Sequence, residues 1–374
     1  MSRYTGWIAD CDLHFGPKSR TELLPYMPSR WRSYFEGGAP MGAFTGNAGN
    51  WGVIAPHSAQ MADSYSPEGE FGPGTDYAYT RGQLLDKHRF YRLILNGAVG
   101  EPLNRYAGPP VARAFNDWTR DTWLSQGDDR LTSVMHMPPG DAEEAAGEIR
   151  RLAPDPRFVA VQQTGAINGL PYGNPVYDPI YAAAVEADRP VHLHPNTSAY
   201  YRMATGPQHT AMAGVVMSLS GYAMHQVTSF IVHGTFEKFP TLTVLIKEHG
   251  VLWLPHLMWR LDRNAEILRA ESPWVKKLPS EYIRSNIRIG SHPLEQGFRG
   301  DGSDVNEVLF ATEGMDELLV YCTDYPHMNF DDPVFISGRL PAAWQERVML
   351  ENGCKLHRWE VPVAPPGELV TAGD

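Results

Sequence analysis

The sequence is poor in cysteine and has no long apolar segment. Its three cysteines, Cys11, Cys322 and Cys354, form no Cys-x-x-Cys pair, which argues against a disulfide framework or a thiolate zinc site. No apolar run is long enough to cross a bilayer, and the first residues lack the apolar core of a signal peptide. We therefore expect a cytoplasmic protein without a membrane partner.

Positive charge is also scarce. The net charge is −11, which argues against nucleic acid as a partner. No Gly-x-Gly-x-x-Gly follows the first predicted strand and no P-loop occurs, so dinucleotide and nucleotide cofactors are not expected. The composition, 43% hydrophobic and 20% charged among 374 residues, is that of an ordinary globular protein. We expect one domain over residues 1–374.

Short apolar segments alternate with helical ones along the chain. This alternation is typical of α/β proteins with parallel strands and right-handed crossovers. Eight such strands predict a (β/α)8 TIM-type barrel, with a doubly wound open sheet as the alternative. The predicted strands are Gly6–Leu13, Arg89–Leu95, Leu131–Met135, Phe158–Gln162, one that begins at Pro190, Leu242–Ile246, Ile287–Gly290 and Leu318–Tyr321.

The segments between the strands predict helices and one long insertion. The insertion, about residues 35–88, follows the first strand, and its glycine- and proline-rich part suggests a lid or an arm that contacts a partner. Phe44, Trp51 and Tyr65 are candidates for closing over a substrate. The predicted helices are Arg20–Tyr34, Pro110–Gln126, Asp141–Leu152, Asp178–Glu186, Tyr222–Phe236, Val251–Ile267, Val305–Ala311, Leu340–Leu350 and one around Cys354–Trp359.

Polar side chains follow several of the predicted strands directly. In a barrel of this type the carboxyl ends of all strands open on one face, where functional groups gather. Nitrogen and carboxylate ligands without sulfur suit Zn²⁺, Mn²⁺, Fe²⁺ or Co²⁺, so we expect a divalent metal centre. The candidates are Asp12 and His14 after the first strand, His194 after the fifth, Glu248 and His249 after the sixth, and Asp324 and His327 after the eighth.

Other histidines have weaker claims to a role in the site. His192 precedes His194 by two residues and is expected on the same side of its strand. We nevertheless expect a structural or exposed position for His192, as for His57, His136, His225, His233 and His292.

Several motifs resemble the amidohydrolase superfamily, in the branch of aminocarboxymuconate-semialdehyde and γ-resorcylate decarboxylases. Asp-Cys-Asp-Leu-His at 10–14 is similar to the opening motif of that branch, and Leu193-His194-Pro195 to its strand-five motif. Gly234–Pro240 followed by Leu242–Gly250 resembles its strand-six block, and Thr323–His327 its last ligand motif. The resemblance implies Asp12, His14, His194 and Asp324 as metal ligands.

The resemblance leaves the strand-six ligand open. Glu248 occupies the position at which the decarboxylases have histidine, and His249 follows it. Alignment favours Glu248, residue chemistry favours His249, and strand alternation allows one of them to face the site. Strand four has Val161-Gln162-Gln163 and no lysine for carboxylation, which favours one metal ion. A bridge from Asp10, Asp12 or Glu248 leaves two ions possible.

The resemblance implies a metal-dependent hydrolase or non-oxidative decarboxylase that acts on a small carboxylate or carbonyl compound. Asp324, Glu248, His249 and His327 are the candidates for proton transfer, His327 by orienting Asp324 or by contacting the substrate. A non-haem iron or manganese oxygenase and a non-catalytic barrel subunit are the alternatives. We expect a homo-oligomer, or a hetero-oligomer with a related barrel chain.

Overall fold

Eight parallel strands form a nearly closed barrel in the computed structural model, which describes residues 4–39, 60–97, 104–138, 140–163, 166–195, 212–298 and 303–363. Strands pair in chain order, and the last returns to the first because Cys11 N–H donates to Tyr321 O at 3.0 Å. The barrel prediction is confirmed, and the open sheet is excluded. The strands are β1 (Ile8–His14), β2 (Phe90–Asn96), β3 (Leu131–His136), β4 (Phe158–Gln163), β5 (Val191–Leu193), β6 (Val244–Ile246), β7 (Ile287–Gly290) and β8 (Leu319–Val320).

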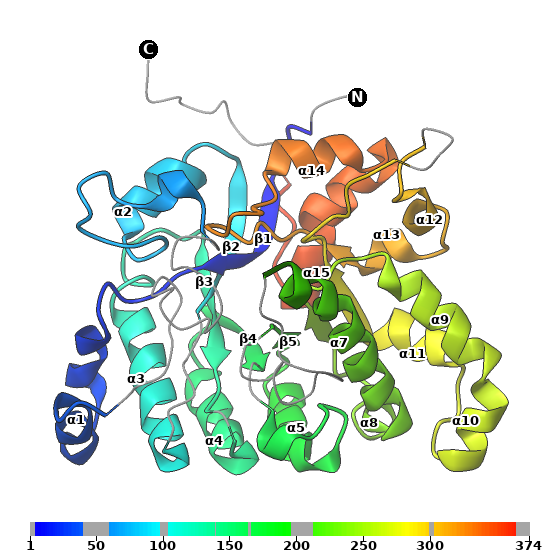
Figure 1. Ribbon diagram of the computed structural model, residues 1–374, viewed down its shortest axis with the longest axis horizontal. Helices are drawn as coiled ribbons and strands as arrows, with labels where there is room; N and C mark the ends of the chain where they lie inside the picture. Colours follow the sequence, from blue (N-terminus) through cyan, green and yellow to red (C-terminus); the bar gives the residue numbers. More distant parts are fainter. Residues whose placement is uncertain are drawn as a thin grey trace.

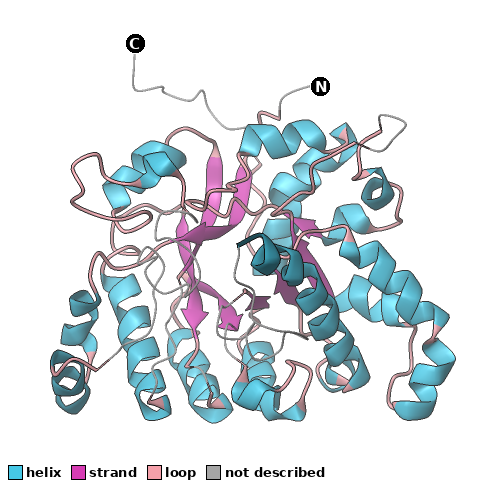
Figure 2. Ribbon diagram, viewed as in Figure 1, coloured by secondary structure: helices cyan, strands magenta, loops and turns pink. Residues whose placement is uncertain are grey.

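Helices surround the strands (Figures 1 and 2). Before β2 come η1 (Arg20–Tyr26), α1 (Ser29–Glu36), η3 (Ala62–Ser64), α2 (Tyr77–Thr80) and η4 (Arg81–Leu85). Between β2 and β6 come η5 (Arg105–Ala107), α3 (Gly108–Asp121), α4 (Ala142–Leu152), η6 (Ile167–Gly169), η7 (Pro175–Tyr177), α5 (Asp178–Glu186), α7 (Met212–Val232) and α8 (Thr235–Lys238). After β6 come α9 (Trp253–Arg263), α10 (Ala265–Glu271), α11 (Pro279–Asn286), α12 (Glu307–Phe310), α13 (Met315–Leu318), α14 (Pro333–Arg339), η8 (Ala342–Trp344), η9 (Arg347–Glu351) and α15 (Asn352–His357). None of these helices has both the length and the apolar character needed to span a membrane.

Side chains that alternate along the strands fill the barrel. Ile94, Val134, Leu245 and Val320 belong to one buried cluster, which Leu356 of α15 joins. Such inward-facing residues fill barrels of this size as a packed core. Because this apolar core fills the interior of the barrel, the polar groups that follow the strands lie at one rim of it.

Prolines alter the bounds of two predicted helices. The predicted helix Arg20–Tyr34 is divided into η1 and α1, with Pro28 extended between them. The helical span predicted as Leu340–Leu350 begins later, because the residue before Pro341 is driven to an extended conformation, and η8 and η9 then follow. The separate helix α14 is capped by Asp332, whose carboxylate accepts the N–H of Val334 and of Phe335.

The described end of the insertion lies against the loop that follows β8. Gln60 forms an antiparallel bridge with His327, and Met61 N–H donates to Pro326 O at 2.9 Å. Phe44, Trp51 and His57 lie outside the described residues. The lid function stays a prediction, as does the single domain over 1–374.

Gly74, near the end of the insertion, packs against the backbone of β1. Its φ is +65°, and a Cβ there would lie 2.5 Å from the carbonyl oxygen of His14. We expect Gly74→Ala to lower the free energy of unfolding by roughly 2–4 kcal/mol, because left-handed strain adds to overpacking. Urea unfolding measures this. Gly69→Ala is the matched control, since Gly69 has φ +72° and open space around it; equal losses in the two variants would contradict the close approach.

Candidate metal centre

The rim of the barrel brings together side chains from four strand ends. Asp12 and His14 end β1, where residues two apart face the same side. One ligand atom from each of Asp12, His14, His194 and Glu248 lies within 4.8 Å of the others. A second group, which shares His14 and Glu248, adds Asp324 and His327 under the same limit. The structure therefore brings these six predicted site residues together in two overlapping groups, which we call the metal-ligand cluster.

The atoms that face one another in this cluster are mostly electron-rich. His14 Nε2 lies 2.7 Å from Glu248 Oε1 and 3.0 Å from Asp324 Oδ1. His194 Nδ1 lies 2.7 Å from Pro195 O, and since a carbonyl only accepts, Nδ1 carries the proton. In the neutral imidazole of His194, Nε2 then carries a lone pair, and it points at His14 Nε2, 3.3 Å away, and at Glu248 Oε1. A cation among these atoms would relieve that arrangement.

Asp12 supplies an independent sign of a cation. Its Oδ1 accepts from Asn96 Nδ2 at 2.6 Å and from Lys247 Nζ at 2.9 Å. Its Oδ2 is buried and has no hydrogen-bond partner, which is costly unless a ligand satisfies it. The carboxylates of Asp12, Glu248 and Asp324 carry three negative charges here, and the ammonium of Lys247 carries one positive charge. Two negative charges therefore remain if the histidines are neutral. The donor set and the charge both fit one divalent ion of the Mn²⁺, Fe²⁺ or Zn²⁺ type.

The backbone at Glu248 decides which strand-six residue faces the cluster. Leu245 and Lys247 point into the barrel, and strict alternation would turn Glu248 outward. Glu248 instead has φ +60°, and this left-handed turn directs its carboxylate to the rim. His249, the alternative ligand, lies outside the cluster because its Nδ1 bonds to Lys247 O and its ring stacks on Tyr222 at 5.7 Å.

His292 belongs to the site, although its sequence context predicted a structural or exposed position. Its Nε2 lies 2.8 Å from Asp324 Oδ2, and its Nδ1 lies 3.0 Å from Asp331 Oδ2. Burial would lower the pKa of His292, but the two carboxylates raise it well above its ordinary value. The missed signal was its place two residues after β7, the strand-end position used to find the other candidates. His327 Nδ1 holds the other oxygen of Asp324 at 2.5 Å.

The remaining histidines of the described chain lie apart from the cluster. His192 is fully buried and its Nε2 lies 3.0 Å from Nε2 of His357 in α15. His136 accepts the N–H of Gly97 at 3.0 Å, and His233 bonds within α7. These residues have structural positions, as expected.

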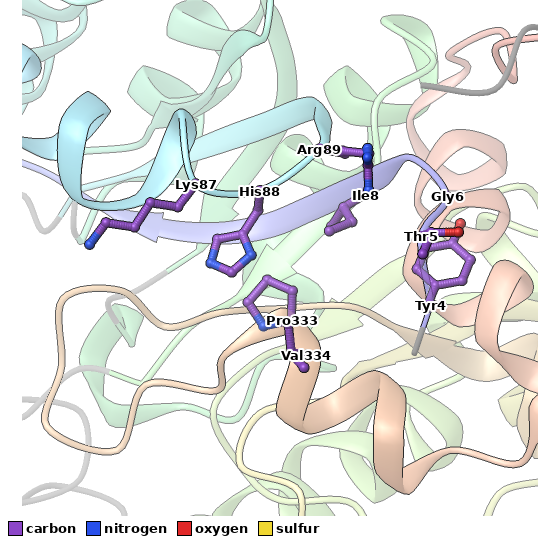
Figure 3. Close-up of a pocket in the computed structure, with 9 residues that line it drawn as sticks. All are labelled: Tyr4, Thr5, Gly6, Ile8, Lys87, His88, Arg89, Pro333 and Val334. Carbon is purple, nitrogen blue, oxygen red and sulfur yellow. The ribbon is translucent and has the colours of Figure 1, made fainter. Parts of the chain in front are cut away.

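A shallow pocket that is open to solvent lies beside the starts of β1 and β2. His88 lines it together with Ile8 and Pro333 (Figure 3). None of its lining residues belongs to the metal-ligand cluster, so it is not the candidate site.

The pKa values of the cluster depend on its carboxylates. Burial would lower the pKa of His14, but the charge of Asp12 and hydrogen bonds with Asp324 and Glu248 raise it to about 10. Burial and Asp324 would raise the pKa of Glu248, yet the charge of His194 and hydrogen bonds with both histidines lower it to about 2. Without a metal ion, a proton on His14 therefore partly neutralises the carboxylates.

Chelator-treated protein should become less stable as pH rises from about 6.5 to about 10. The pKa of His14 is about 10 in the fold and 6.5 unperturbed, so its stabilisation is complete below pH 6.5 and lost through pH 10. Urea unfolding across this range measures the slope. His14→Gln should remove most of this pH dependence. A slope in the variant as steep as that of wild type would contradict the assignment of the effect to His14.

Comparison with known proteins agrees with the barrel fold and with the resemblance to the amidohydrolases. The amidohydrolase family model matches residues 9–359. The decarboxylase orsB of Emericella nidulans is 26% identical over 138 residues, which is 35% of this chain and 41% of that protein's length. An amidohydrolase from Mycobacterium avium subsp. paratuberculosis superposes with a TM-score of 0.68 at 18% identity, over 94% of this chain and 99% of that one. A dihydroxybenzoic acid decarboxylase from Polaromonas, with bound manganese and 2-nitroresorcinol, superposes with a TM-score of 0.62 at 17% identity, over 94% of this chain and 97% of that one. The chain therefore belongs to the amidohydrolase family.

Proposed function

We propose that this protein is a metal-dependent, non-oxidative decarboxylase of a small aromatic carboxylate with a neighbouring oxygen substituent. The observation that supports it most is the cluster of Asp12, His14, His194 and Glu248, in which Asp12 keeps an unpartnered Oδ2, beside an Asp324 held by two histidines. The names of two relatives, both decarboxylases, indicate the reaction.

The residues divide into two sets of roles. Asp12, His14, His194 and Glu248 would hold the ion, and Asp324 borders them through its 3.0 Å contact with His14. Manganese is the metal we infer, since a relative binds it and the set of nitrogen and oxygen donors suits it. When bound, the ion supplies Lewis acidity toward the substrate carboxylate and the neighbouring oxygen.

The protein must then supply a proton. The bond between ring carbon and carboxylate breaks, its electron pair stays on the ring carbon, and that carbon takes a proton while CO₂ leaves. We assign the proton transfer to the Asp324–His327 pair, whose atoms lie 2.5 Å apart. His292 donates to the other oxygen of Asp324 at 2.8 Å and is itself fixed by Asp331, which orients the pair.

The test combines metal analysis with a product assay. Protein purified without chelator should contain manganese or another divalent metal, and should release one CO₂ per arene formed from a dihydroxybenzoate, with deuterium at the ring carbon in D₂O. Chelator should abolish turnover, and Mn²⁺ should restore it. Retained activity in metal-free protein, or no CO₂ from any hydroxybenzoate in a panel, would overturn the proposal.

Hydrolysis is the second candidate, because the family is named for it and Asp324 can serve equally as the base that activates water. Cleavage of a lactone or amide in the same panel, without CO₂, would favour it. The oxygenase and partner-subunit alternatives stay predictions, as does oligomer formation.

A further inference from the structure

Lys247 lies inside the barrel beneath the metal-ligand cluster. It directly follows β6 and shares the inward direction of Leu245. Its side chain is fully buried, and it is the only buried lysine among the residues that the structure describes. Its Nζ lies 2.9 Å from Asp12 Oδ1 and 3.5 Å from the carbonyl oxygen of Cys11.

The surroundings offer this ammonium little except Asp12. Leu245, Val320 and the thiols of Cys11 and Cys322 form the buried cluster at this level of the barrel, and Lys247 contributes to the electrostatic environment of both thiols. Among the described carboxylates, Asp12 is the one within ion-pair distance of Lys247. A buried ion pair gives little net stability compared with apolar packing, so stability alone does not account for a lysine here.

The contacts of Asp12 explain what the lysine achieves. Lys247 Nζ and Asn96 Nδ2 both donate to Oδ1, and Asn96 is held in turn by Gln162 Nε2 at 2.5 Å. These donors occupy Oδ1, which is also the Asp12 oxygen that lies 3.7 Å from His14 Nε2, whereas Oδ2 has no partner.

We propose that Lys247 is a fixed cation of the metal centre, which fills the role of a second divalent ion and restricts the site to one. The inference rests on the proposed metal centre. The ammonium neutralises the Asp12 oxygen that a second ion would have to share, and its charge repels a further cation. Lys247 is thus a positioning residue for Asp12, and it sets the number of ions bound.

Lys247→Met tests this with metal stoichiometry as the readout. The variant leaves Asp12 Oδ1 without its cation, so the excess negative charge at the site increases. Wild type titrated with Mn²⁺ should bind one ion per chain, even in excess, with the electron paramagnetic resonance spectrum of isolated Mn²⁺. Lys247→Met should bind up to two, with a spin-coupled spectrum, and Mn²⁺ should raise its Tm more than that of wild type.

Lys18→Met is the matched control, because Lys18 is exposed and pairs with Asp76 at 2.6 Å; it should behave as wild type. If Lys247→Met folds only with metal, the Asp12→Asn/Lys247→Met double variant, which removes both buried charges, should fold without it and lose the Mn²⁺-induced shift. Two ions in wild type, or one ion and an unchanged Tm shift in Lys247→Met, would overturn the inference while leaving the metal centre intact. No Mn²⁺ bound to wild type would instead refute the metal centre itself.

Discussion

Replacing Asp324 by asparagine is expected to lower kcat for decarboxylation by roughly 10²- to 10⁴-fold, the usual contribution of a positioned acid or base. Asparagine keeps the shape and one acceptor oxygen, but it cannot share a proton with His327 across the 2.5 Å contact. Its amide also cannot accept fully from both His292 and His327. Steady-state kinetics with a dihydroxybenzoate, together with metal content measured on the same sample, separates proton transfer from metal binding.

Asp332→Asn is the matched control for this prediction. Asp332 caps α14 and lies outside the metal-ligand cluster, so kcat should change little. An Asp324→Asn variant that keeps its metal and its full kcat would remove Asp324 from the reaction. If instead the metal is lost together with activity, Asp324 acts mainly as a ligand.

Replacing His194 by alanine is expected to remove most of the bound metal and, with it, turnover. His194 Nε2 is the nitrogen that faces both His14 and Glu248, and Pro195 O fixes its protonation on the other ring nitrogen. The affinity should fall by more than the roughly 10- to 100-fold that loss of an outer hydrogen-bond partner costs. Competition with a chelator of known affinity measures the change.

His225→Ala is the control for His194→Ala, because His225 lies exposed on α7. Its metal content should equal that of wild type. Thermal unfolding of His194→Ala with and without Mn²⁺ provides a second readout, since a ligand that binds only the folded state raises Tm. Full metal retention in His194→Ala would contradict the proposed ligand set.

The barrel was predictable because its strands are short apolar runs whose spacing leaves room for one helix each. Even β5 and β8, which are 3 and 2 residues long, were found from their apolar residues and the polar motifs that follow. The resemblance to the amidohydrolases is confirmed by the family match. Helix boundaries were less predictable, because Pro28 and Pro341 act through local backbone geometry that apolar periodicity does not record.

The clustering of the candidate ligands was predictable where it follows strand alternation. Asp12 and His14 share a face of β1, and His194 follows β5 directly, so a period of two was sufficient. Glu248 could not be separated from His249, because a left-handed backbone at a residue other than glycine leaves no trace in periodicity. Asn96 and Lys247 were missed because they act inside the barrel on another side chain, and such contacts depend on tertiary packing.

Both Glu248 and Asp324 have left-handed backbones, with φ of +60° and +58°. Each such residue costs roughly 1 kcal/mol or more compared with glycine, and each also places a carboxylate in a crowded anionic environment. Selection for heat resistance alone should therefore favour glycine at both positions. Engineering of this protein for robustness should hold these two codons constant, since the substitutions that strengthen the scaffold there would erase its chemistry.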